Sequence, residues 1–411
     1  MNTKNTLKII ISTSLFFSSC NNRLIYPAST PEFSAPPVEG DSIAPSLKTS
    51  VDEILNDSIT PTEVCVKNGD IEVLECYNID GELISSVQVP GIGSADPQGL
   101  YLAGAAGSGI VPPVVYFSWD PEQSLLKSEN GTALPLRKTN SFLAMAGVPE
   151  EPVLAFSDMV FEDNIPHSYL YAGSLQALGN SNPFFEILDT KMEMVLMPVA
   201  VEAVGSQAGK VWYTHSAWEI SGEERVFPIN RGLYVFDLVT GQNSQLLGAE
   251  RNFQGLSPDK AQAGSISIDF KGDHSMRVTN LLSGRVTNFP LDPTNDRGAG
   301  YAVFSIDGTY TAWVETGGSL IAGPPDFMTR IRIGNIEKGT VIQELESSWA
   351  SKVLGWDWVS FMRPVGWLNA QTLIIEVNEG NLKTAALIKY DISDESLQLL
   401  CMGSFASFSY P

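Results

Sequence analysis

The feature that most limits the fold of this chain is a short element that recurs along its C-terminal half. In each copy an apolar strand is followed by Asp or Asn, three further residues and usually Gly. The copies are VFDLVTG, VTNLLSG, IGNIEKG and KYDISDE, and their Asp237, Asn280, Asn335 and Asp391 are 43, 55 and 56 residues apart. We expect these four side chains to form hydrogen bonds where a strand enters a turn, because Asp and Asn readily bond to nearby backbone groups.

The repeats lie within a long series of short strands. From about Glu63 onward, apolar runs alternate with clusters of Gly, Pro, Asn and Asp, and no long stretch has a clean helical period. Repeats of about 40 to 55 residues built from short strands are typical of propeller blades. The sequence therefore predicts an all-β fold, a β-propeller of six four-stranded blades, with seven as the alternative.

Several stretches resemble a known repeat family. The pair FSIDGTYTAWV and RIRIGNIEKG, and the stretch GLYVFDLVTGQNSQLL, resemble blades of the TolB-like or WD40-like propellers, in which a Ser-Pro-Asp-Gly turn precedes an Asp-x-x-x-Gly turn. The resemblance is clear over about Leu233 to Leu400. It implies a propeller of usually six four-stranded blades in an exported bacterial protein. These motifs mark turns, so they imply a fold and no particular activity.

A propeller leaves no open edge when strands from both ends of the chain share one blade. We therefore expect the last strand to pair with the first strand of the propeller. The stretch LQLLCMGSF, from Leu397 to Phe405, is the predicted closing strand.

The N-terminus carries the pattern of an export signal. Lys4 and Lys8 precede an apolar stretch that is too short to span a bilayer, which predicts a signal peptide over residues 1–19. The following FSSC resembles a bacterial lipobox, which implies lipidation of Cys20. Residues 20–62 are rich in Pro and Ser and predict a disordered, lipid-anchored linker. The predicted propeller domain covers residues 63–411.

The charge of the chain limits its partners. Asp and Glu number 47 against 25 Lys and Arg, for a formal net charge of −22. Such a surface repels phosphate backbones, so nucleic acid is excluded as a partner. With the export signal, the sequence predicts an extracytoplasmic protein held to a bacterial membrane in the cell envelope.

The sequence favours a non-enzymatic role. It contains no Gly-x-Ser-x-Gly, P-loop, His-Glu-x-x-His or Cys-x-x-Cys motif. We therefore predict a binding or scaffold module for protein partners, with no cofactor and no resident metal. Two alternatives stay open: binding of a glycan or envelope polymer, and a metal-dependent hydrolase with carboxylates on the propeller axis.

The glycan alternative depends on tryptophans. Trp212 and Trp218 lie in WYTHSAW, and Trp356 and Trp358 lie in LGWDWV. Aromatic faces stack on sugar rings, so these four residues are the candidate ligand platform. The competing interpretation is packing between blades, where tryptophans fill space.

The cysteines predict one disulfide. If Cys20 is lipidated, Cys65, Cys76 and Cys401 remain in an oxidising compartment, and at most one bridge forms within the chain. We favour Cys65 with Cys76, because the loop between them is short. A tight turn at Asn68-Gly69 would separate the two, which leaves a wider turn near Asp70-Ile71 or a bridge to Cys401 as the choices.

Overall fold

The structure is a computed structural model, and it describes residues 61–67, 73–88, 100–103, 115–120, 125–128, 133–134, 143–148, 151–162, 165–174, 185–188, 194–217, 227–267, 275–292, 298–318, 327–380 and 384–409. All of them belong to one compact unit, Asp52–Pro411. The predicted signal peptide, Cys20 and nearly all of the predicted linker lie outside the described residues.

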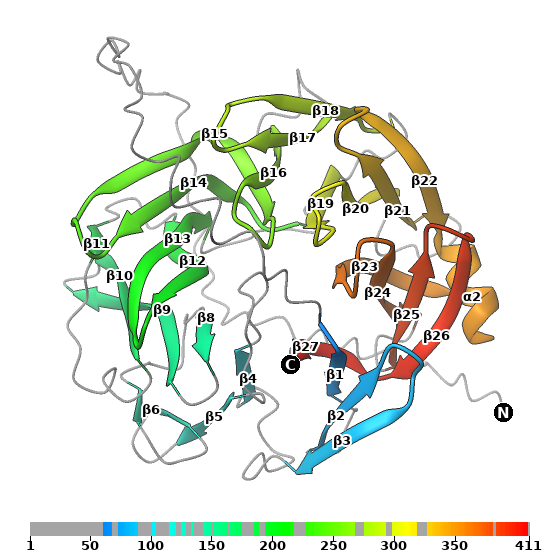
Figure 1. Ribbon diagram of the computed structural model, residues 1–411, viewed down its shortest axis with the longest axis horizontal. Helices are drawn as coiled ribbons and strands as arrows, with labels where there is room; N and C mark the ends of the chain where they lie inside the picture. Colours follow the sequence, from blue (N-terminus) through cyan, green and yellow to red (C-terminus); the bar gives the residue numbers. More distant parts are fainter. Residues whose placement is uncertain are drawn as a thin grey trace, which may run out of the picture. The chain divides into compact units, whose positions relative to one another are not determined.

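The described strands form antiparallel sheets, as the alternation of apolar and polar residues predicts (Figure 1). Two four-stranded sheets come from the first half of the chain. They are β4 (Leu100–Ala103), β5 (Val115–Asp120), β6 (Leu125–Ser128) and β7 (Ala133–Leu134), and β8 (Leu143–Val148), β9 (Glu151–Glu162), β10 (Ile165–Ser174) and β11 (Phe185–Leu188).

Two further four-stranded sheets come from the second half, each in chain order. They are β19 (Gly298–Phe304), β20 (Tyr310–Gly318), β21 (Phe327–Asn335) and β22 (Thr340–Glu346), and β23 (Val359–Trp367), β24 (Thr372–Glu379), β25 (Ala385–Asp391) and β26 (Ser396–Met402).

The middle of the chain forms a sheet of seven strands. It consists of β12 (Met194–Val204), β13 (Gln207–Ala217), β14 (Asn230–Asp237), β15 (Asn243–Leu256), β16 (Gln262–Ser267), β17 (Ser275–Asn280) and β18 (Val286–Pro290). The long strand β15 is shared. Its first half pairs mainly with β14, up to Leu247, and its second half pairs with β16 from Arg251 onward. The seven-stranded sheet therefore consists of two four-stranded sets, β12–β15 and β15–β18, which share strand β15.

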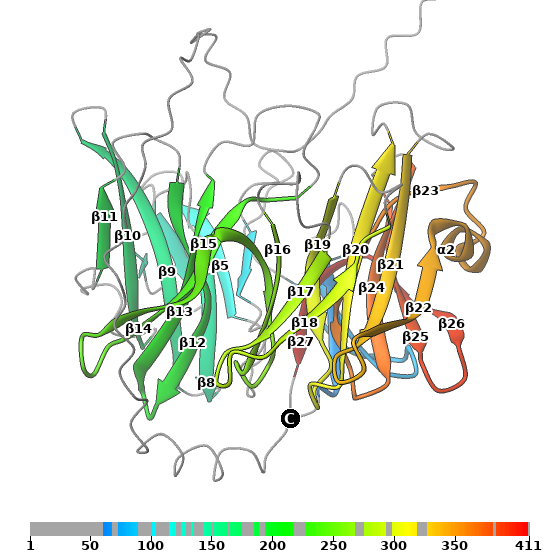
Figure 2. The ribbon, with the colours of Figure 1, turned by 90° about the horizontal axis from the view of Figure 1, so that it is seen from above.

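Successive sheets pack face to face through apolar side chains. Trp313 and Phe289 join β18 to the β19–β22 sheet, and their ring centroids are 5.3 Å apart. Ile331 and Ile375 belong to the core between the β19–β22 and β23–β26 sheets. Figure 2 shows these sheets standing side by side. Burial between sheets, rather than within one sheet, holds this part of the fold together.

The predicted pairing of the two chain ends is confirmed. The closing sheet has the order β27 (Ser404–Ser409), β1 (Glu63–Lys67), β2 (Val73–Asn78) and β3 (Leu83–Gln88). The predicted closing strand was wrong in its position, because Leu397 to Met402 form β26 of the preceding sheet. The chain crosses to the closing sheet at Gly403, whose φ of 120° suits glycine.

The predicted role of the repeated Asp and Asn residues is confirmed. Oδ1 of Asp237 accepts hydrogen bonds from the backbone N–H groups of Val239 and Thr240, and Oδ1 of Asn280 accepts from those of Leu282 and Ser283. The bonds from Thr240 and Val239 help to hold the pKa of the Asp237 carboxyl below its usual value. Asn335 and Asp391 accept similar bonds from Lys338 and Ser393.

The sequence did not predict the α-helix that is found among the described residues. Helix α2 spans Ser347–Leu354, ends at Gly355 in the left-handed conformation (φ 67°), and buries Ala350. Eight residues are too few for a clear helical period in a strand-rich sequence, and packing decides the conformation here. Within the described part of the chain, no helix has the length and apolarity needed to cross a membrane.

Candidate functional site

The three described residues of the predicted tryptophan platform are buried or half-buried. Trp212 on β13 is only 7% exposed and packs with Leu233 and Phe253 in the core of its sheet. The Lys260 ammonium lies 5.5 Å from the centre of its ring, and burial lowers the pKa of that lysine. Trp212 therefore has no free face for a sugar.

The other platform residues also contribute to packing. Trp356 is half-buried against the core between the β19–β22 and β23–β26 sheets. Trp358 is half-buried too, and its indole ring lies directly against Gly380. Trp218 lies outside the described residues. The described platform residues thus serve the contacts between strands and sheets.

The structure joins Cys65 to Cys76. The two residues lie directly opposite each other on β1 and β2 with their Cα atoms 4.0 Å apart, the register of the wider turn near Asp70-Ile71. Cys401 packs beside Tyr77, on the opposite face of β2 from Cys76. Burial, and then the charge of Glu75, raise the pKa of the Cys401 thiol to about 12. This thiol is inert at neutral pH.

One metal-ligating group stands out among the described residues. The ligand atoms of Glu63, Cys65 and Cys76 lie within 4.8 Å of one another. The two sulfur atoms are joined in the disulfide, so they do not offer the thiolates that a metal would bind.

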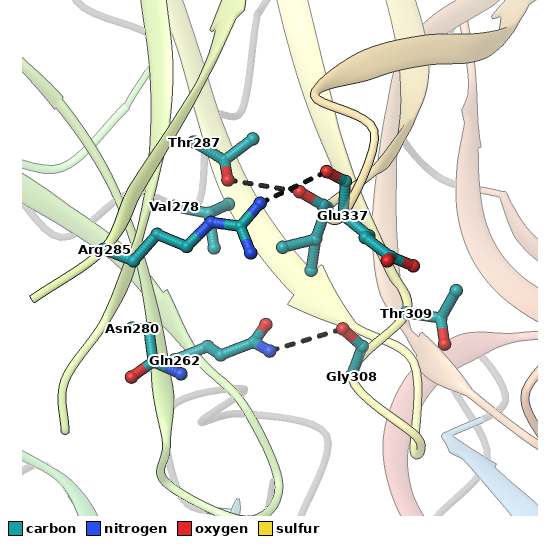
Figure 3. Close-up of a pocket in the computed structure, with 9 residues that line it drawn as sticks. Gln262, Val278, Asn280, Arg285, Thr287, Gly308, Thr309 and Glu337 are labelled. Atoms are coloured by element: carbon teal, nitrogen blue, oxygen red, sulfur yellow. Dashed lines mark hydrogen bonds between the residues drawn. The ribbon is translucent and has the colours of Figure 1, made fainter. Parts of the chain in front are cut away.

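A polar pocket of about 260 Å³ opens between β16–β18 and the turns of the β19–β22 sheet (Figure 3). We call it the seam pocket; its lining residues are Gln262, Val278, Asn280, Arg285, Thr287, Gly308, Thr309, Ile336 and Glu337.

Hydrogen bonds already cross the seam pocket. The Gln262 amide donates to the carbonyl of Gly308 (3.3 Å), and the Thr287 hydroxyl donates to that of Ile336 (3.1 Å). Arg285 donates to the carbonyl of Glu337 at 3.4 Å. Figure 3 shows these bonds running from one sheet to the other. The polar groups of the seam pocket therefore tie neighbouring sheets together.

A buried charge cluster strengthens the same seam. The Glu315 carboxylate is fully buried and accepts hydrogen bonds from Arg332 (3.1 Å), the Trp313 indole (2.8 Å) and the backbone N–H of Asp292 (3.1 Å). Arg332 also donates to the carbonyl of Pro290 at 2.9 Å. A buried carboxylate with three donors has its hydrogen bonds satisfied and fixes the geometry of its neighbours.

Helix α2 lies beside β26 at the outer rim (Figure 1). A different kind of pocket lies between them. It has a volume of about 450 Å³ and is lined by Trp349, Lys352, Val353 and Leu397, which we call the rim pocket. Trp349 and Val353 are one helical turn apart and lie on one face of α2. Ala350 is the buried residue of the helix, and Trp349 and Val353 line the pocket.

The rim pocket exposes large apolar side chains. Trp349 is 44% exposed and Val353 37%, and Leu397 on β26 is partly exposed. Val239 and Leu282, two of the many other exposed apolar residues, lie in tight turns. Isolated exposed residues are normal in proteins, whereas an apolar cluster around a hollow marks a contact surface. The rim pocket is therefore the candidate functional site.

Sequence reasoning missed this site, although one signal was present. Trp349, Lys352 and Val353 have the spacing of one helical face, but Leu397 comes from a strand much further along the chain. Only the packing of α2 beside β26 brings the helix and the strand together.

Comparison with known proteins finds structural neighbours at low identity only. No protein-family model matches the chain, and no curated protein matches it. Among solved structures, TolB from Acinetobacter baumannii is 14% identical, with a TM-score of 0.36 over 90% of this chain and 86% of that one. The Dos1 propeller is 11% identical, with a TM-score of 0.45 over 86% of this chain and 90% of that one. The chain is thus similar in structure, at low identity, to TolB-like and other β-propeller proteins.

Proposed function

We propose that this chain is a binding module that recognises a protein partner through the rim pocket. The observation that carries the proposal is the exposed pair Trp349 and Val353, which lines a hollow of about 450 Å³ together with Leu397. Tryptophan is enriched among the residues that dominate binding energy at protein interfaces. Covering these side chains with a partner would remove apolar surface from water.

The proposal extends to the architecture and location of the protein. The sharing of β15 between two four-stranded sets supports a propeller of seven blades rather than six. The N-terminal pattern that ends at Cys20 supports an exported, lipid-anchored protein of the bacterial cell envelope. In this proposal the linker holds the module near the membrane, where a protein partner meets the rim pocket.

A protein partner is favoured over a glycan by the position of the tryptophans. Trp212 is 7% exposed, so its ring offers no open face for stacking, and Trp356 is half-buried. The exposed Trp349 lies beside aliphatic side chains rather than beside a row of hydrogen-bonding groups. That environment suits an apolar side chain better than a sugar.

Quantitative co-purification from the native membrane fraction tests the proposal. We expect Trp349→Ala to reduce the amount of one co-purifying protein by about tenfold relative to wild type. Leu282→Ala is the matched control, because Leu282 is 65% exposed in a turn away from α2. Equal recovery with wild type and both variants would contradict the proposal.

A further inference from the structure

We propose that the rim pocket binds a peptide segment in which an apolar side chain lies next to a carboxylate, which rests on the proposed function above. The apolar side chain of the peptide is inferred from the residues that line the rim pocket. Trp349, Val353 and Leu397 supply aromatic and aliphatic surface from two elements. A hollow of this kind suits an inserted apolar side chain, whose burial provides the main affinity.

The carboxylate of the peptide is inferred from Lys352. It is the charged residue that lines the pocket, on the same helix as Trp349 and Val353. Its position in the last turn of α2 complements the helix dipole, but it forms no ion pair within the described part of the chain. A partner that covers the pocket would desolvate this ammonium, and an unpaired buried charge is costly. A carboxylate on the partner removes that cost.

Two acidic residues beside the two elements of the pocket have partners within the chain. Glu346, which precedes α2, lies 3.9 Å from the Arg330 guanidinium. Asp394, which precedes β26, accepts a hydrogen bond of 2.9 Å from the backbone N–H of Ser396. Lys352 is therefore left to neutralise a charge brought by the partner. Because the chain is acidic overall, a basic group beside an apolar hollow selects for an acidic segment locally.

The formal net charge of −22 also disfavours two other occupants. A second copy of this chain would meet strong like-charge repulsion, and so would a surface of anionic lipid. A short acidic segment on a less charged partner meets much less repulsion, and its carboxylate pairs with Lys352.

The test uses two synthetic peptides that share a central Leu-Leu pair, one flanked by glutamates and the other by lysines. We expect wild type to bind the glutamate peptide about fivefold more tightly at low salt, measured by fluorescence anisotropy. Lys352→Glu should reverse the preference. Lys338→Glu, the same charge change at an exposed position away from α2, should keep it. Trp349→Ala should weaken binding of both peptides.

Four results would overturn the inference. They are binding of neither peptide, no preference by wild type, a preference unchanged by Lys352→Glu, and a wild-type dimer in sedimentation that Trp349→Ala dissociates. If the peptides fail while co-purification still depends on Trp349, the acidic chemistry is wrong and the proposed function stands. If co-purification is also insensitive to Trp349, both fail. Circular dichroism of each variant shows whether the fold is retained.

Discussion

The seam pocket and the rim pocket lie at two neighbouring junctions of the molecule and differ in what their side chains already do. In the seam pocket, Gln262, Thr287 and Arg285 are hydrogen-bonded across to the next sheet. In the rim pocket, Trp349 and Val353 remain exposed to water. Polar groups that are already paired stabilise the fold, whereas exposed apolar groups gain from a partner. We therefore assign a stabilising role to the seam pocket and a binding role to the rim pocket.

The comparison predicts that breaking a contact between sheets harms the fold most. Ending the chain after Gly403 removes β27, which leaves an edge of β1 unpaired and takes Phe408 away from Val64 and Val66. We expect a loss of about 5 kcal/mol or more in the free energy of unfolding, with loss of the single cooperative transition in urea. Ending the chain after Ser409, which keeps β27, is the control. An unchanged urea midpoint without β27 would show that the chain closes elsewhere.

At the seam, we expect the buried Glu315 carboxylate to contribute far more to the free energy of unfolding than Glu337 in the adjacent seam pocket. Glu315→Ala leaves Arg332 and the Trp313 indole without their shared acceptor, which should lower the free energy of unfolding by about 3 to 5 kcal/mol. Glu337→Ala changes an exposed carboxylate that lines the seam pocket, and we expect a change within about 0.5 kcal/mol. Urea unfolding measures both. Similar effects of the two substitutions would remove the distinction between the buried cluster and the pocket.

The disulfide also belongs to the stabilising contacts, because it cross-links β1 and β2 of the closing sheet. Replacing both Cys65 and Cys76 by Ser should cost up to about 3 kcal/mol in the chain-entropy account. Cys401→Ser is the control, since that thiol packs on the other face of β2. Peptide mapping without reductant should give a linked pair that contains Cys65 and Cys76. A linked peptide that contains Cys401 would refute the pairing.

The smallest effect on stability is expected at the rim. Trp349→Ala should change the free energy of unfolding by no more than about 0.5 kcal/mol, because the side chain is 44% exposed and outside the main cores. Thermal unfolding alongside wild type checks this. A loss above about 2 kcal/mol would mean that Trp349 serves packing, and its role in binding would then lose its support.

The sequence predicted the features that depend on neighbours along the chain. The turns at Asp237 and Asn280 follow from side chains that bond to backbone groups two or three residues away. The all-β class follows from alternation within each strand. The closing sheet was predicted in principle, because an open edge is unfavourable, but β27 was placed too early in the chain.

The features that depend on packing between distant segments were not predicted. Nothing in the local sequence around Trp212 distinguishes a buried ring from an exposed one, since both occur in alternating strands. The conformation of α2 and the contribution of Leu397 to the rim pocket depend on how neighbouring sheets meet. Sequence reasoning therefore chose Trp356 and Trp358 as ligand residues, whereas the structure exposes Trp349.

The most direct test of the account is to ask what lies against the rim pocket in living cells. A photo-crosslinking amino acid at position 352 should give a discrete adduct with one protein, and the same group at position 338 should give none. Adding Trp349→Ala should abolish the adduct, because the apolar contact that holds the partner is lost. Equal labelling at the two positions, or an adduct at position 352 that persists without Trp349, would contradict the assignment of binding to the rim pocket.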